Sequence, residues 1–320
     1  MILNSFLLII GLVLLFYCSD ILVDNASSIA TSLSVRPIVV GLTIVAFGTS
    51  APELLVSLFA SFSGESGISI GNILGSNVMN IALVLGASVI VKPIRLKTRG
   101  RVNKELFFMI TASALFWVMC SDGSIGRING IILVTMLLMF LAYSYMTSKK
   151  SNTDDAEIIN DSEKKMFKKT VLIITGIAGL CVGANLVVTN AVAIADFYNI
   201  SKTFIGISVV AFGTSLPELA TSIIAAKKGE SEIAIGNVIG SNMFNICMVM
   251  GIVGILSPLQ VEPGLNRFEF PFMVFISIIL AVFLNTSDSI NRKHGIFLII
   301  TFIIYIAVSW HLTVPAGQGF

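Results

Sequence analysis

The chain has few charged residues, and the two signs nearly balance. Only 12% of its 320 residues are Asp, Glu, Lys or Arg, whereas 55% are hydrophobic, and the formal net charge is +2. A soluble domain needs a larger polar fraction to cover its surface. The small net charge gives no reason to expect a nucleic-acid partner. The composition therefore indicates an integral membrane protein whose surroundings are the lipid bilayer.

Cysteine and histidine are also scarce. The four cysteines, Cys18, Cys120, Cys181 and Cys247, stand singly without CxxC spacing, which argues against zinc or redox chemistry. The two histidines lie at the ends of the last apolar run, and neither HExxH nor GxSxG occurs. A membrane hydrolase that uses two carboxylates as acid and base is a rival interpretation. We expect no enzyme activity and no cofactor.

Long apolar runs, in contrast, are abundant. A spanning helix needs about 20 mainly apolar residues, and ten such segments can be placed between charged or turn-forming clusters. They cover residues 2–25, 37–62, 68–91, 106–120 and 125–146, then 171–195, 203–226, 233–256, 268–284 and 294–312. We therefore expect an all-α membrane protein with about ten transmembrane helices.

The two halves of the chain repeat each other. Residues 47–86 align without a gap on residues 212–251, at an offset of 165, with 23 of 40 positions identical. This predicts a first five-helix repeat over residues 1–146, a linker over 147–169 and a second repeat over 170–320. Because five is odd, the second repeat must enter the membrane from the opposite side. Such inverted repeats are typical of transporters that bind their substrates at the midplane.

The basic residues give the orientation. If both termini lie outside, 17 of the 20 Lys and Arg residues fall in cytoplasmic segments, as the positive-inside rule expects. We predict a multi-pass protein of the cell membrane with a cytoplasmic linker. The linker also contains acidic residues, so a regulatory cation site is a second interpretation of it, although their spacing matches no Ca²⁺ loop. The oligomeric state stays open, with a monomer compatible.

One motif places a glutamate inside the second apolar run of each repeat. Phe-Gly-Thr-Ser-x-Pro-Glu occurs at residues 47–53 and 212–218, ending on Glu53 and Glu218. An ionised carboxylate at the membrane centre costs at least ~2.5–3.5 kcal/mol, so it indicates function. Pro52 and Pro217 lack an N–H and break the helix, which frees backbone carbonyls. Together with neighbouring hydroxyls, these groups form an oxygen-donor set that suits Ca²⁺, Mg²⁺ or Na⁺.

A second motif follows in the third run of each repeat. Gly-Asn-x-x-Gly-Ser-Asn-x-x-Asn occurs at residues 71–80 and 236–245. Ser76 and Asn80 are four residues apart and share a helix face, as do Ser241 and Asn245. Gly71 and Gly75, like Gly236 and Gly240, are spaced for close helix packing. The remaining asparagines, Asn72, Asn77, Asn237 and Asn242, are candidates for hydrogen bonds between helices.

These paired motifs resemble the sodium/calcium exchanger family of the cation/Ca²⁺ antiporter superfamily, and the chain is most similar to its short prokaryotic members. The resemblance implies antiport of Na⁺ and Ca²⁺ as transported ions. It implies Ca²⁺ ligands at Thr49, Glu53, Thr214 and Glu218. It implies Na⁺ ligands at these residues and at Ala46, Ser50, Ser76, Ala211, Ser215 and Ser241, with Asn80 and Asn245 lining the centre.

One position departs from some relatives. Potassium-dependent exchangers carry Asp at the position of Asn245, whereas this chain has Asn in both repeats. Ca²⁺ would therefore leave a two-carboxylate site formally neutral, which favours potassium-independent exchange. Two alternatives stay open: H⁺/Ca²⁺ antiport, because glutamates carry protons, and a Ca²⁺-selective channel, because channels also use rings of carboxylates and carbonyls.

Overall fold

The described part of the chain is almost entirely helical. The computed structural model describes residues 2–32, 35–64, 66–95, 102–147, 163–197, 211–287 and 289–313. In the first half the helices are α1 (Ile2–Ser32), α2 (Pro37–Val40), α3 (Ala46–Thr49), α4 (Ala51–Phe62), α5 (Ser66–Met79), α6 (Gly86–Val91), α7 (Asn103–Cys120) and α8 (Arg127–Met146). In the second half they are α9 (Glu163–Phe197), α11 (Ala211–Thr214), α12 (Leu216–Lys228), α13 (Ser231–Met243), α14 (Gly251–Leu256), α15 (Glu269–Thr286) and α16 (Arg292–Thr313).

Three π-helical segments connect some of these helices into longer rods. They are η1 (Gly41–Val45) between α2 and α3, η2 (Asn80–Leu85) between α5 and α6, and η4 (Phe244–Met250) between α13 and α14. A short 3₁₀ helix, η5 (Pro263–Asn266), precedes α15. Sequence periodicity does not predict the π segments, which are rare and often mark functional sites.

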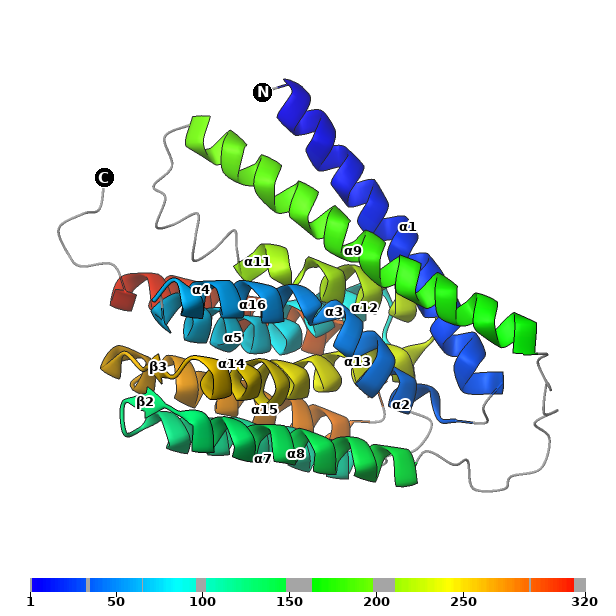
Figure 1. The fold of residues 1–320 in the computed structure, drawn as a ribbon. Helices are drawn as coiled ribbons and strands as arrows, with labels where there is room; N and C mark the ends of the chain where they lie inside the picture. The colour runs from blue at the N-terminus through cyan, green and yellow to red at the C-terminus, as the bar shows by residue number, and fades with distance from the viewer. Residues whose placement is uncertain are drawn as a thin grey trace.

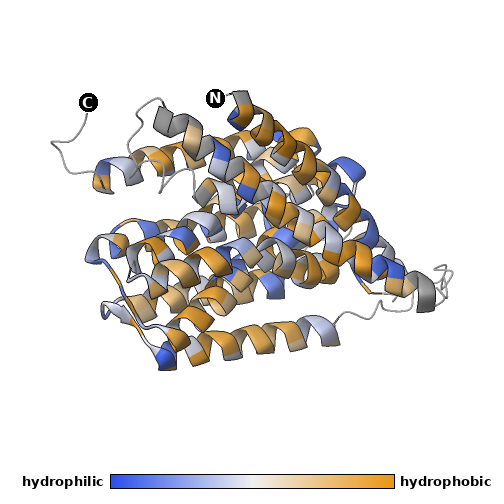
Figure 2. Cartoon of the chain, turned by 45° about the horizontal axis from the view of Figure 1, so that its top comes forward, coloured by the Kyte–Doolittle hydropathy of each residue, from blue (hydrophilic) through white to orange (hydrophobic). Residues whose placement is uncertain are grey.

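Seven of the described helical rods are long and apolar enough to cross a membrane, and a bent pair makes an eighth candidate. The bent pair joins residues 37–49 to α4 at an angle of 42°. Two of the ten predicted spans are not among these eight candidates. The predicted span 106–120 corresponds to α7, a helix of 18 residues, and the predicted span 203–226 lies partly outside the described residues. Figure 2 shows that hydrophobic residues, in orange, run along most of the described helices.

Burial separates the central rods from the outer ones. The rod that contains α5 and the rod that contains α13 have 78% and 89% of their most apolar window buried, against 22–39% for the other five candidates. The long helices α1 and α9 lie side by side across the remaining helices (Figure 1).

The second glycine motif allows α13 to pack closely against α2, because a Cβ at Gly236 would lie 2.5 Å from the Ile38 carbonyl oxygen. Gly71, in contrast, faces no described atom within 4 Å.

Two short strand pairs connect the halves in a symmetric way. Strand β1 (Ile94–Arg95) pairs antiparallel with β4 (Ser289–Ile290), and β2 (Ser124–Ile125) pairs antiparallel with β3 (Leu259–Gln260). Ile94 pairs with Ile290, and Ile125 pairs with Leu259. At the repeat offset of 165, Ile94 corresponds to Leu259 and Ile125 to Ile290, so each strand pair is the repeat-related copy of the other. These strands add four two-residue elements to the predicted all-α fold.

The boundaries of two predicted segments differ in the structure. The first span is predicted to end at residue 25, but α1 continues to Ser32. Helix α9 begins at Glu163, so the last residues of the predicted linker are helical, while residues 148–162 lie outside the described residues. Asp20 and Asp24 are consequently well inside α1, where Lys228 pairs with both carboxylates.

Candidate cation site

Both glutamates lie in the first turn of a helix that begins inside the fold. The helix breaks at Ser50 (φ −83°, ψ 6°) and at Ser215 (φ −85°, ψ 4°), and Pro52 and Pro217 are second in the helices that follow. Proline is tolerated there because its missing N–H would have no partner in a first turn. The break puts Glu53 and Glu218 at positive helix ends, where negative charge is stabilised.

The two carboxylates are fully buried and each is bonded to the other repeat. The Ser50 hydroxyl donates to Glu218 Oε1 at 3.2 Å, and the Ser215 hydroxyl donates to Glu53 Oε1 at 3.4 Å. Both glutamates have 0% of their surface exposed. Each half of the chain therefore donates a hydrogen bond to a carboxylate of the other half.

The threonines that precede these serines are held by asparagines of the third rod. Thr49 donates to Asn237 Oδ1 at 3.2 Å, and Thr214 donates to Asn72 Oδ1 at 3.3 Å. Thr49 Oγ1 also lies 3.4 Å from the Ser241 hydroxyl. The prediction that Asn72 and Asn237 make hydrogen bonds between helices is therefore confirmed.

Sequence reasoning overlooked two serines that orient these asparagines. Asn72 Nδ2 donates to the Ser57 hydroxyl at 3.1 Å, and Asn237 Nδ2 donates to the Ser222 hydroxyl at 2.9 Å. The available signal was that Ser57 and Ser222 are identical at the repeat offset of 165. Their role is to fix the amide orientation, so that the carbonyl end faces the threonine.

The central asparagines lie where the rods turn π-helical. Asn80 is the first residue of η2, and Asn245 is the second residue of η4. Asn80 Nδ2 donates to Asn242 Oδ1 at 3.2 Å, whereas the amide of Asn77 bonds the Ile73 carbonyl in its own helix. The expected interhelical bond is therefore confirmed for Asn242, whereas the Asn77 amide bonds within its own helix.

Several buried oxygen atoms around the carboxylates have no hydrogen-bond partner. They are Glu53 Oε2, Glu218 Oε2, Ser76 Oγ, Asn80 Oδ1 and Asn245 Oδ1. An unsatisfied buried polar group costs about 1–3 kcal/mol, and more when it is charged. Ser76, Asn80 and Asn245, like Ser241, lie in the two central rods. Glu53 and Glu218 lie in α4 and α12, and the buried Ala46 begins α3. Ala211 begins α11, the segment that ends on Thr214.

The donor set favours a hard cation. Within the described ranges, no group of three or more His, Cys, Asp or Glu side chains could hold a metal ion. What the fold gathers instead is two carboxylates with hydroxyl and amide oxygens, the chemistry that binds Ca²⁺ or Na⁺ rather than zinc or copper. The assignment of individual residues to individual ions stays a prediction.

The chain was compared with known proteins. The family model described as sodium/calcium exchanger protein matches residues 3–146 and 168–311. The sodium/calcium exchanger MaX1 of Methanosarcina acetivorans is 31% identical, over 97% of this chain and 99% of the relative. The Ca(2+)/H(+) antiporter ChaA of Bacillus subtilis is 27% identical, over 85% of this chain and 83% of the relative.

A solved structure has the same fold over nearly the whole chain. It is the sodium-calcium exchanger NCX_Mj soaked with 10 mM Na⁺ and zero Ca²⁺. The TM-score is 0.85 and the sequence identity is 34%, over 96% of this chain and 98% of the other.

Proposed function

Because the chain belongs to the sodium/calcium exchanger protein family, we propose that it exchanges Na⁺ for Ca²⁺ by alternating access. The observation that carries this proposal is the pair of fully buried glutamates, each bonded to a serine of the other repeat. Two empty carboxylates in an apolar interior are costly, so they need a cation in every state that crosses the membrane. That requirement couples the movement of one ion to the movement of the other.

We propose that Ca²⁺ is bound at the centre by four residues, Thr49, Glu53, Thr214 and Glu218. The threonines contribute backbone carbonyls and the glutamates contribute carboxylates, consistent with the oxygen coordination that Ca²⁺ prefers. The unpartnered Oε2 atoms of Glu53 and Glu218 support this assignment. One Ca²⁺ neutralises both charges, so no further cation is required.

Na⁺ would occupy sites around the same carboxylates. The additional ligands in this proposal are Ala46, Ser50, Ser76, Ala211, Ser215 and Ser241, with Asn80 and Asn245 lining the centre. The unpartnered Ser76 hydroxyl and Asn80 Oδ1 support this arrangement. Since the carboxylates are shared, Na⁺ and Ca²⁺ compete for the site, and net Ca²⁺ flux needs a Na⁺ or Ca²⁺ gradient.

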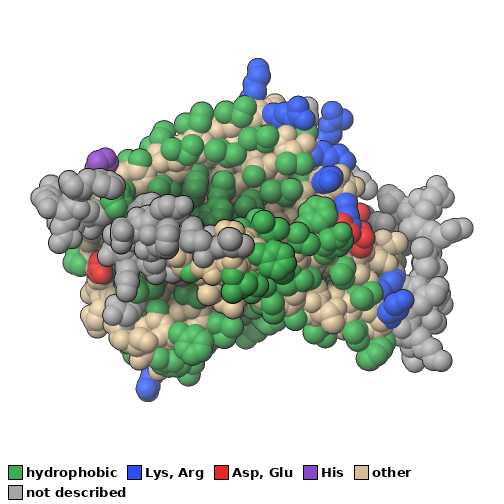
Figure 3. All heavy atoms as spheres, turned by 90° about the horizontal axis from the view of Figure 1, so that it is seen from above, with side chains coloured by type: hydrophobic (Ala, Val, Ile, Leu, Met, Phe, Trp, Pro, Cys, Tyr) green, Lys and Arg blue, Asp and Glu red, His purple; other side chains and the backbone are tan. Residues whose placement is uncertain are grey.

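The proposed topology is ten spans in two inverted repeats, with both termini outside and the linker 147–169 in the cytoplasm. The symmetric strand pairs β1–β4 and β2–β3 support a two-fold relation between the repeats. Lys and Arg side chains gather toward one end of the molecule in Figure 3, which agrees with a cytoplasmic side at that end. We expect the long helices α1 and α9 to slide past the buried site as the gating elements.

The deciding experiment is uptake of ⁴⁵Ca²⁺ into proteoliposomes under an imposed Na⁺, K⁺ or H⁺ gradient. An outward Na⁺ gradient should drive uptake, whereas a K⁺ gradient at zero potential should not. If more than two Na⁺ exchange for each Ca²⁺, a potassium-diffusion potential should change the rate. Uptake that follows the H⁺ gradient and ignores Na⁺ would replace the proposal with H⁺/Ca²⁺ antiport.

H⁺/Ca²⁺ antiport is the second candidate, and the similarity to the Ca(2+)/H(+) antiporter of Bacillus subtilis supports it. The Na⁺ proposal is preferred because the carboxylates are surrounded by paired hydroxyls, such as Ser50 and Ser215. A Ca²⁺ channel is distinguished by efflux from loaded vesicles into medium without Na⁺ or Ca²⁺. Sustained rapid efflux there would mean an uncoupled pathway.

A further inference from the structure

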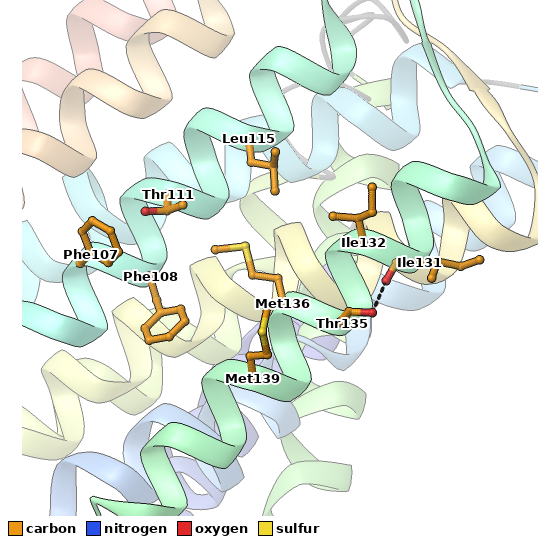
Figure 4. A pocket seen from close by; sticks show the side chains of 9 residues that line it. All are labelled: Phe107, Phe108, Thr111, Leu115, Ile131, Ile132, Thr135, Met136 and Met139. Atoms are coloured by element: carbon orange, nitrogen blue, oxygen red, sulfur yellow. Dashed lines mark hydrogen bonds between the residues drawn. The ribbon is translucent and has the colours of Figure 1, made fainter.

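A groove lies on the outer surface of the protein between α7 and α8. Figure 4 shows nine side chains around it, and its volume is about 380 Å³. Its walls are formed mainly by Phe107, Phe108, Leu115, Ile131, Met136 and Met139. The hydroxyl of Thr135 donates to the Ile131 carbonyl at 2.8 Å, so this threonine presents little polarity to the groove. The groove is therefore apolar.

The packing of the two helices explains why the groove exists. Helix α8 packs chiefly against α14 and η4, and α7 packs chiefly against α15, so the two helices share less contact with each other than with these neighbours. Phe107 and Ile131 are more than half exposed. On a membrane protein, such an exposed apolar surface faces lipid.

The groove has the length of a lipid chain in one leaflet. The rise along α7 from Phe107 to Leu115 is about 12 Å, and half of the hydrocarbon core is about 15 Å. Lys104 lies one turn before Phe107, and its Nζ is 5.5 Å from the ring centroid of Tyr143 near the end of α8. A positive charge and a phenol thus stand at one end of the groove.

Lys104 is available for a headgroup. Lys104 is exposed, and no carboxylate of the described residues forms an ion pair with it. A lysine at the membrane surface attracts anionic lipid. We propose that the groove binds one acyl chain of an anionic glycerophospholipid, with the headgroup phosphate at Lys104.

The second repeat lacks the same features, which supports a specific site. The buried positions of α7 and α15 coincide when Glu105 is aligned with Glu269, an offset of 164 rather than 165. This alignment pairs Thr111 with Phe275 and Lys104 with Phe268. In α15 the Phe275 ring packs 6.0 Å from that of Phe272. Large aromatic rings therefore occupy the surface that corresponds to the groove, and no lysine stands at its end.

The first test is native mass spectrometry of the full chain with dioleoyl phosphatidylglycerol or dioleoyl phosphatidylcholine. We expect one phosphatidylglycerol retained per protein, with about fivefold higher affinity than phosphatidylcholine. Glycerol 3-phosphate, which has no acyl chain, should not displace it. Equal binding of the two lipids would overturn the proposal, and so would displacement by glycerol phosphate.

Two variants locate the lipid. Thr111→Phe inserts the second-repeat residue into the groove and should abolish retention of the lipid. Lys104→Gln should remove the preference for phosphatidylglycerol, while Lys168→Gln, an equal charge change at an exposed position of α9, should not. Size-exclusion chromatography checks that the variants are folded. Unchanged retention in Thr111→Phe, or the same small effect in both lysine variants, would contradict the site. This inference rests on the membrane location alone, so it stands or fails separately from ion specificity.

Discussion

The two repeats are alike at the buried site and different where their long helices are anchored. Glu53 and Glu218 each accept a bond from the opposite serine. At the end of α12, however, Lys228 pairs with Asp20 and Asp24 of α1, each at 2.7 Å. The residues aligned with these three in the other repeat are Ser63, Asn185 and Thr189, which carry no charge.

A second bond strengthens the anchor of α1. The Ser27 hydroxyl donates to Glu230 Oε1 at 2.7 Å, just beyond Lys228.

A site that receives the same ions from both sides of the membrane, as we propose, benefits from symmetry. Two end states of a symmetric transporter would have equal energy, so an ion pair present in only one repeat favours one of them. We therefore expect the anchors, rather than the ligands, to set the preferred conformation.

The largest expected effect tests the symmetric half of this comparison. Glu53→Gln and Glu218→Gln should each abolish ⁴⁵Ca²⁺ transport, by about 100-fold or more, because removing one partner of a buried charged site costs about 3–5 kcal/mol. The change leaves volume nearly constant, so both variants should stay monodisperse. Full activity in either would remove the central claim, and unequal losses would show that the carboxylates are not equivalent.

A sided-labelling experiment tests whether the repeats are inverted. A cysteine introduced at Ser66, the first residue of α5, should react with an impermeant maleimide from outside only. One introduced at Thr98 or Ser151, which lie outside the described residues, should react from the cytoplasmic side only. The native thiols Cys18, Cys120 and Cys247 are buried, which keeps the background low. Labelling of Ser66 and Thr98 positions from the same face would break the inverted model.

The equivalent serines of the third rods should give a smaller effect. Ser76→Ala and Ser241→Ala each remove one hydroxyl, worth about 1–3 kcal/mol when buried. We expect the Na⁺ concentration for half-maximal exchange to rise about tenfold, and that for Ca²⁺ to change less, because two carboxylates dominate Ca²⁺ binding. Equal losses for both ions would contradict this division of roles.

The smallest effect tests the asymmetric anchor. Lys228 is 26% exposed, and Asp20 and Asp24 are 43% and 63% exposed, so each pair is worth at most about 1 kcal/mol. Lys228→Gln should therefore speed exchange about two- to fivefold and reduce its dependence on ionic strength. Ser63→Lys is the matched variant, because it adds a lysine at the aligned position of the first repeat, where the residues aligned with the two aspartates are the uncharged Asn185 and Thr189. If both variants behave alike, the ion pairs do not bias the transporter.

The chemistry of the site was largely predictable because it is written twice. The repeat motifs identified Glu53 and Glu218 and predicted a helix break beside Pro52 and Pro217, which the structure has. They also indicated the family, which the comparisons confirm. The polar supports were harder to predict. Ser57 and Ser222 appear as ordinary small residues in an apolar helix, and only their bonds to Asn72 and Asn237 reveal what they do.

The linear sequence determined the apolar spans, the duplication and the identity of the buried carboxylates. Apolar runs, a repeated motif and a charge inside an apolar run can all be read from the order of the residues alone. Tertiary structure alone decided that each serine bonds the opposite glutamate, that the rods become π-helical at Asn80 and Phe244, and that Lys228 holds α1. The hydrogen bonds and ion pairs join residues far apart in the chain, and a π turn is a rare interruption of an α-helix that is frequent at functional sites. Their formation depends on how whole helices pack, which no single segment encodes.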